Sequence, residues 1–202
     1  MKKNAQQQQL ARRDQAADLA VKVSTVSIGV NLALSVAKLI AGAVGKSSAM
    51  ISDAVHSASD VLASFIVIIG VRFARKKADH NHPYGHERME CIAAILLAMI
   101  LAAIGIGIGG AGVQKITAGG YETLLVPGRL PLAAAVVSIA VKEWMFWYTR
   151  GAAKKINSSA LMAEAWHHRS DALSSVGSFA GILFARLGYP VMDAVASVII
   201  SL

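Results

Sequence analysis

Long apolar segments separated by short charged connections run along the whole chain. On hydrophobic and polar positions alone, six segments can be drawn, at about 19–43, 48–72, 90–113, 130–149, 159–186 and 190–202. A bilayer whose hydrocarbon core is ~30 Å thick needs roughly 20 apolar helical residues to be crossed, and all segments but the last reach that length. The pattern predicts an all-α membrane protein. We expect a six-transmembrane-helix bundle over residues 19–202, preceded by a polar N-terminal tail at 1–18.

The last segment is shorter than the others. It begins at Pro190 and is still apolar at Leu202. At a rise of 1.5 Å per residue such a helix extends about 20 Å, less than the bilayer core. We therefore expect the sixth helix to be truncated.

Composition and charge agree with a membrane protein. The chain is 55% hydrophobic and carries a formal net charge of +8. Because the basic residues lie between apolar segments and form no basic-aromatic surface module, we expect no nucleic-acid partner. They favour the tail and the second and fourth connections: Lys2, Lys3, Arg12 and Arg13, then Arg72, Arg75, Lys76, Lys77 and Arg88, then Arg150, Lys154 and Lys155. The positive-inside rule predicts a cytoplasmic N-terminus in a multi-pass protein of the plasma or inner membrane.

Two apolar segments contain ionisable residues near their middle. His56 and Asp60 are four positions apart in the second segment, and His167 and Asp171 repeat this spacing in the fifth. Residues four apart share a helix face, and ionisable groups at membrane depth usually face a cavity or a partner. Two imidazoles and two carboxylates form a donor set suited to tetrahedral Zn²⁺ and tolerable to other borderline divalent ions. His168 would point about 100° away from His167, so we expect it not to be a ligand.

The connection after the second segment is a second candidate for metal binding. It contains Asp79, His80, His82 and His86 around the turn Pro83-Tyr84-Gly85. Such a density of nitrogen and carboxylate donors suits a metal ion. A polar loop whose histidines titrate, or cap the next helix, explains the same residues.

Other polar positions in the apolar segments have two interpretations. The first segment carries Ser24, Ser27, Asn31, Ser35 and Lys38 at spacings of three or four. This stripe either bonds neighbouring helices or forms a wetted wall beside the charged helix. In the fourth segment Lys142 and Glu143 could pair or extend to the membrane surface. Glycines between Gly105 and Gly112 are typical of close helix packing.

Three motifs resemble the cation diffusion facilitator family of metal transporters. They are Ser-Asp-Ala-Val-His-Ser-Ala-Ser-Asp ending at Asp60, Asp-His-Asn-His-Pro-Tyr-Gly-His-Glu-Arg-Met-Glu starting at Asp79, and Ala-Glu-Ala-Trp-His-His-Arg-Ser-Asp ending at Asp171. The resemblance implies a six-helix homodimer that exchanges a cytoplasmic divalent cation for protons, and that is not an enzyme. It places the transport site on His56, Asp60, His167 and Asp171, and maps a lesser loop site to Asp79, His82 and His86. His/Asp pairs on both helices look like the family's zinc-preferring pattern. The family usually adds a C-terminal cytoplasmic domain after the sixth helix, and we expect this domain to be absent here.

The predicted function is therefore proton-coupled efflux of a divalent metal cation, with Zn²⁺ as the expected substrate. Neutral imidazole is the form that binds metal, so protons and metal compete for the histidines. One alternative is the same transporter for Fe²⁺, Mn²⁺, Co²⁺, Cd²⁺ or Ni²⁺. Another is a metal-binding membrane assembly or sensing subunit that does not transport. The expected partners are the metal ion, protons, membrane lipid and a second copy of the chain.

Overall fold

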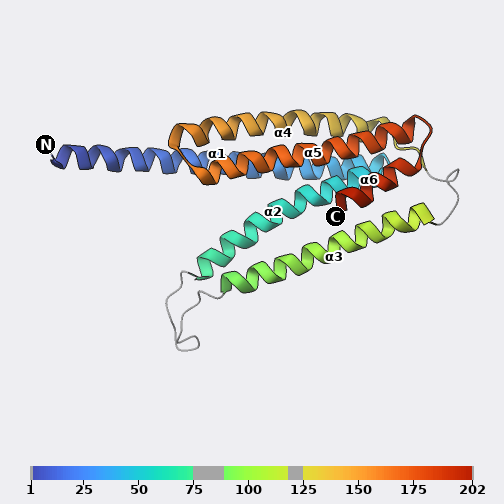
Figure 1. Ribbon diagram of the computed structural model, residues 1–202, viewed down its shortest axis with the longest axis horizontal. Coiled ribbons are helices and arrows are strands. Elements are labelled where there is room, and N and C mark those ends of the chain that lie inside the picture. The colour runs from blue at the N-terminus through green and yellow to red at the C-terminus, as the bar shows by residue number, and fades with distance from the viewer. Residues whose placement is uncertain (1, 75–88, 118–124, 202) are drawn as a thin grey trace.

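The computed structural model describes residues 2–74, 89–117 and 125–201, and these form six helices and no strand (Figure 1). The helices are α1 (Lys2–Val44), α2 (Ser48–Ala74), α3 (Met89–Thr117), α4 (Arg129–Ile156), α5 (Ser159–Arg186) and α6 (Val191–Ser201). The predicted all-α fold is confirmed.

The helix bounds lie within about four residues of the predicted segments except at the N-terminus and at the end of α4, which continues to Ile156 where the sequence predicted 149. The region 2–18, expected as a tail, is helical and continuous with the first apolar segment. It is rich in Gln, Ala, Lys and Arg and contains neither Gly nor Pro, so local propensity favours helix there. The apolar part of α1 begins only at Gln15.

Within the described residues, three helical stretches are long and apolar enough to cross a membrane. They are Gln15–Val44, Ile95–Thr117 and Arg129–Ile156, while α6 is a shorter apolar helix. The other two long helices, α2 and α5, carry the ionisable residues of the predicted site. The length and apolar composition of these helices indicate an integral membrane protein.

Side by side along the long axis lie α1, α4 and α5 (Figure 1). A tight turn joins α4 to α5: Asn157 ends α4 in the left-handed conformation (φ 51°, ψ 44°), and the Ser158 side chain accepts a hydrogen bond from the Leu161 N–H. Such caps satisfy backbone groups that helix ends leave without partners. The turn makes α4 and α5 an antiparallel pair.

On the other side of this group, α2 packs against α1, α5, α6 and α3. At the end of the bundle nearer the N-terminus, α2 and α3 diverge from α1, α4 and α5 (Figure 1). At the opposite end the helices meet around an apolar cluster that includes Ala41, Met50, Ala135 and Ile182. The bundle is therefore closed at one end and splayed at the other.

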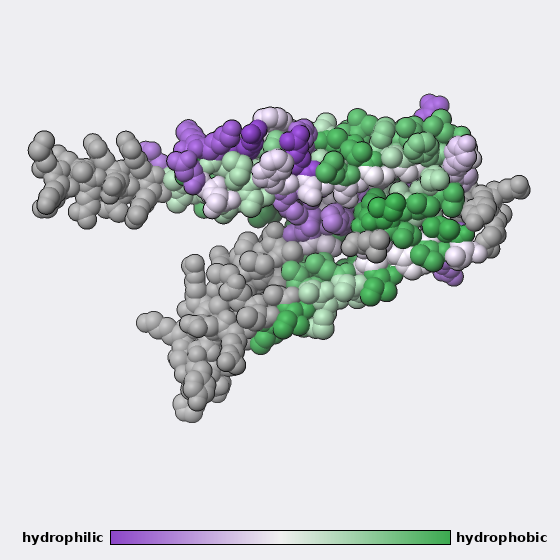
Figure 2. Space-filling model, in the orientation of Figure 1, coloured by the Kyte–Doolittle hydropathy of each residue, from purple (hydrophilic) through white to green (hydrophobic). Residues whose placement is uncertain are grey.

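The outer surface of the closed end is apolar. Figure 2 shows hydrophobic residues over most of this end and hydrophilic residues around the turn between α4 and α5. Leu39 and Ile40 of α1, for example, are about half exposed. Large exposed apolar side chains are typical of a surface that contacts lipid, because their exposure to hydrocarbon lacks the free-energy cost of exposure to water.

Glycines of α3 allow α6 to approach closely. A Cβ atom at Gly112 would lie 2.6 Å from Val198 Cγ2, and one at Gly109 would lie 2.8 Å from Ser201 Oγ. Gly107 and Gly110, by contrast, have no such neighbour within 4 Å. The small-residue packing predicted for this segment is confirmed on the face turned toward α6.

Candidate metal site

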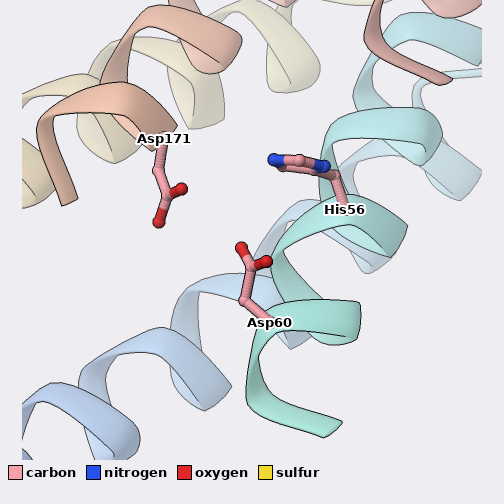
Figure 3. A group of neighbouring side chains, drawn as sticks. All are labelled: His56, Asp60 and Asp171. Carbon is pink, nitrogen blue, oxygen red and sulfur yellow. The ribbon is translucent and has the colours of Figure 1, made fainter. Parts of the chain in front are cut away.

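The candidate site lies between α2 and α5. His56 and Asp60 come from successive turns of α2, and Asp171 comes from the middle of α5. One possible ligand atom from each of these residues lies within 4.8 Å of the other two. Figure 3 shows the three side chains directed toward a common space between the two helices. The structure therefore brings together three of the four predicted ligands of the transport site.

The fourth predicted ligand, His167, lies beside this group. Its Nε2 is 3.9 Å from Asp60 Oδ2, and its Nδ1 is 3.8 Å from Asp171 Oδ1. The imidazole is 51% exposed and Asp60 is 23% exposed, whereas Asp171 is buried. His167 thus stands on the accessible side of the two carboxylates, within a small side-chain movement of either.

His168 faces another part of the bundle. It is buried, and its Nε2 lies 3.2 Å from Ser27 Oγ of α1. Glu164 belongs to the same neighbourhood, because Ser24 Oγ donates to its carboxylate at 3.2 Å. These contacts place His168 between α5 and α1, as expected for a residue outside the metal-binding group.

Lys142 of α4 is part of the site, and sequence reasoning did not identify it. Its Nζ lies 2.5 Å from Asp171 Oδ2 and donates a hydrogen bond to Asn31 Oδ1 at 2.6 Å. The side chain is fully buried. Neither of the two interpretations left open for Lys142 holds: Glu143 accepts from Trp147 Nε1 and lies 3.7 Å from Arg169, and Lys142 is buried rather than extended to the membrane surface. A lysine in the middle of an apolar segment was the available signal, since such residues are costly unless partnered.

A second buried ion pair involves Lys38 of α1, which lies about two helical turns beyond Asn31. Lys38 Nζ is 3.0 Å from Asp53 Oδ2, and both side chains are 1% exposed. Lys38 also donates to Ser57 and Ser175 at 3.0 Å. Asp53 in turn accepts hydrogen bonds from the hydroxyls of Ser175 and Ser178. We call Lys38, Asp53, Ser57, Ser175 and Ser178 the lower cluster.

The polar stripe of α1 supplies partners to both levels. Asn31 binds Lys142 at the level of the site, Lys38 belongs to the lower cluster, and Ser27 contacts His168. These side chains are buried rather than lining a wet wall. Hydrogen bonding between helices is therefore the interpretation of the stripe that the structure confirms.

Charge distinguishes the two levels. In the lower cluster one carboxylate, Asp53, faces one ammonium, Lys38, so formal charges balance. At the site two carboxylates, Asp60 and Asp171, come close enough to share one ligand position, and Lys142 pairs with Asp171. Two carboxylates converge there beside an imidazole, His56, whereas the lower cluster offers one carboxylate already paired with Lys38, so the site is the more favourable place for a cation.

A cavity reaches the site from the side of α3 and α6. It measures about 660 Å³, and its lining includes His56, Asp60 and Ser52 of α2 together with the glycine face of α3. A polar edge along an otherwise apolar cavity is the usual arrangement where a small ligand must be oriented. The site is therefore accessible, while the lower cluster beneath it is sealed.

The loop residues Asp79, His82 and His86 lie outside the described residues. The predicted second site stays a prediction.

An all-helical membrane bundle with imidazoles and carboxylates between two of its helices defines a class of metal-handling membrane protein. The family model described as the cation efflux transmembrane domain matches residues 24–202. The chain belongs to this family, the cation diffusion facilitators.

Several relatives of known name are also transporters or metal tolerance proteins. An uncharacterized transporter of Methanocaldococcus jannaschii, MJ0449, is 41% identical over 177 residues, which are 88% of this chain and 62% of the relative. Metal tolerance protein C1 of Arabidopsis thaliana is 34% identical over 89% of this chain and 41% of its own length. The manganese efflux system protein MneS of Bacillus subtilis is 34% identical over 88% of this chain and 60% of its own length. The chain thus spans less than two thirds of each of these relatives. The family consists of transporters rather than enzymes.

Proposed function

We propose that this chain moves a divalent metal cation out of the cytoplasm in exchange for protons, holding the ion between α2 and α5. The observation that carries this proposal is the gathering of His56, Asp60 and Asp171 within 4.8 Å. His167 stands within 3.9 Å of both carboxylates, close enough to complete the set. Membership of the cation efflux family supports the same conclusion.

Zn²⁺ is the substrate that we propose first. Two imidazole nitrogens and two carboxylate oxygens suit a tetrahedral Zn²⁺ ion. Mn²⁺ is the second candidate, because carboxylate-rich sites also suit it and two relatives from Bacillus subtilis are named as manganese efflux proteins. Affinity order favours Zn²⁺ over Mn²⁺ but does not by itself decide which ion is transported, because cells select by geometry and availability.

Proton coupling follows from the ligands. Imidazole ligates metal only when neutral, and a free imidazole takes up a proton near pH 6.5. A proton that reaches His56 or His167 from the far side therefore favours release of the metal ion. Return of the proton to the cytoplasm restores the donor set. Alternating exposure of the site to the two sides of the membrane completes the cycle.

The orientation that we propose places the splayed end of the bundle in the cytoplasm. The basic residues of the N-terminus and of the last two turns of α4 lie at this end (Figure 1). In this orientation the cytoplasmic metal ion reaches the partly exposed His167 and Asp60, and between α1, α2 and α5 the buried lower cluster separates the site from the far side. The homodimer and the loop site on Asp79, His82 and His86 stay predictions of the family resemblance.

The test is metal uptake into vesicles that contain the purified protein and a zinc-sensitive dye, with an imposed pH gradient. We expect the gradient to drive Zn²⁺ uptake and Asp60→Ala to abolish it, because one of the gathered ligands is lost. Glu143→Gln is the matched control: it also removes a carboxylate of a long helix, but one that binds Trp147 rather than the site. Unchanged uptake by the Asp60→Ala protein would end the proposal. Competition by Mn²⁺ in the same assay identifies the preferred ion.

A further inference from the structure

Lys142 holds a positive charge directly against a carboxylate of the candidate site. Its Nζ contacts Asp171 Oδ2 at 2.5 Å, while Asp171 Oδ1 faces His167 at 3.8 Å. A metal ion bound by Asp171 must therefore share this carboxylate with an ammonium group. Like charges a few ångströms apart repel strongly where water is excluded.

The surroundings of Lys142 offer its ammonium a second acceptor. Asn31 Oδ1 of α1 lies 2.6 Å from Nζ, and neither Lys142 nor Asn31 is exposed beyond 9%. The lysine side chain has a flexible stem of four carbons and three N–H donors. It can thus give up Asp171 and still keep a hydrogen bond to Asn31, which avoids leaving a buried charge without any partner.

The lower cluster provides the contrast. Lys38 is as deeply buried as Lys142, but its carboxylate partner, Asp53, is not among the gathered donors. Its acceptors Ser57 and Ser175 complete a closed network of matched charge. Lys38 is explained by a role in holding the helices together. Lys142, in contrast, pairs with Asp171, a carboxylate that is also a possible metal ligand.

We propose that Lys142 is a tethered cation that competes with the transported metal ion for Asp171, and that Asn31 receives its ammonium when the metal ion binds. This inference rests on the proposed function. Competition of this kind lowers the affinity of the site, which favours release of the ion. It also keeps the buried carboxylate paired when no metal ion is bound.

The competing explanation is that Lys142 only positions Asp171 for the metal ion. The two explanations predict opposite effects of removing the charge. Lys142→Gln removes the charge but keeps a hydrogen-bond donor, and Lys142→Met removes both. Competition predicts tighter metal binding by both variants. A positioning role predicts weaker binding by Lys142→Met and little change in Lys142→Gln.

The experiment is a titration of the purified full chain in detergent with Zn²⁺ alone, read by competition with a chelating fluorescent indicator. At about pH 8, where ordinary carboxyl groups are ionised, we expect Lys142→Gln and Lys142→Met to bind Zn²⁺ at least about tenfold more tightly than the unmodified chain. Lys38→Gln is the matched control and is expected to change the affinity much less. Equal tightening by Lys38→Gln, or unchanged or weaker binding by both Lys142 variants, overturns the proposal.

Asn31→Ala tests the second half of the proposal. With Asn31 gone the ammonium loses its alternative acceptor, so we expect Zn²⁺ to bind several-fold more weakly. Unchanged or tighter binding overturns the proposal, and this variant decides the matter alone if neither Lys142 variant elutes as a folded protein.

The unmodified chain and Asp60→Ala separate this inference from the proposed function. If the unmodified chain binds no Zn²⁺, or if Asp60→Ala binds it equally well, the proposed site is wrong. If Asp60→Ala loses binding and the Lys142 variants show no gain, only the role of Lys142 is wrong.

Discussion

At the scale of single residues, two lysines and two aspartates are buried in the bundle, and each charged group has an oppositely charged partner in place of water. Lys38 with Asp53, and Lys142 with Asp171, form buried pairs whose partners come from different helices. Ser57, Ser175 and Asn31 accept from the two ammonium groups, and Ser175 and Ser178 donate to Asp53. Buried pairs of this kind tolerate replacement as pairs, but breaking one leaves an uncompensated charge.

We therefore predict that Lys38→Met destabilises the protein by about 3 to 5 kcal/mol, because Asp53 is left buried without its ammonium partner. The double variant Lys38→Met/Asp53→Leu is expected to recover most of the lost stability. Chemical unfolding in detergent, followed by circular dichroism, measures both. Equal destabilisation of the single and double variants would show that the pair itself is not what matters.

At the scale of helices, α5 links the site to the packing of the bundle. Its polar residues face α2 and α4 in the region of Asp171 and Ser175, and further along it meets α6. Gly181 is where α5 and α6 come closest: a Cβ atom there would lie 2.3 Å from Ala196 Cβ and 3.0 Å from the Met192 carbonyl oxygen. One turn earlier, a Cβ atom at Gly177 would meet its nearest neighbour, Ile200 Cγ1, at 4.0 Å.

The substitution Gly181→Ala is predicted to destabilise the bundle by about 1 to 3 kcal/mol, because α6 must move away from α5. Gly177→Ala makes the same chemical change in open contact and is expected to be neutral or stabilising, since alanine favours helix over glycine by about 1 kcal/mol. Thermal unfolding of both variants in detergent compares them. A similar melting temperature for the two would contradict the close packing of α5 and α6.

At the scale of the whole molecule, the bundle has two unlike ends. One is closed over the lower cluster and an apolar core, and the other is splayed between α2 and α5 (Figure 1). The candidate site lies between them, with His167 turned toward solvent and Lys38 sealed. Under the proposed function, this asymmetry corresponds to a conformation that accepts the metal ion from one side.

The proposed orientation predicts which end of α4 faces the cytoplasm. In a chain whose native Cys91 is replaced by serine, we expect Arg129→Cys to react with a membrane-impermeant maleimide added to intact cells. Lys155→Cys, at the other end of the same helix, is expected to react only after permeabilisation. Both positions are exposed, so reactivity reports the side of the membrane rather than burial. The reverse labelling pattern would invert the proposed direction of transport.

Hydropathy and spacing along the sequence determined the helical class of this protein, the approximate bounds of α2 to α6, and the pairing of His56 with Asp60 and of His167 with Asp171. These are local properties, because a helix fixes the relation between residues four positions apart wherever it lies in the molecule. Local propensity also accounts for the helical conformation of residues 2–18, the polar N-terminal tail.

Only the tertiary structure decided which side chains meet across helices. Lys142 reaches Asn31 and Asp171, which are 111 and 29 residues away in the sequence, and Lys38 reaches Asp53 and Ser175. The crossing of α2 with α5 also determined that His56, Asp60 and Asp171 converge while His167 stands beside them. Such contacts depend on how rigid helices rotate and cross, and a single sequence carries no local signal for either.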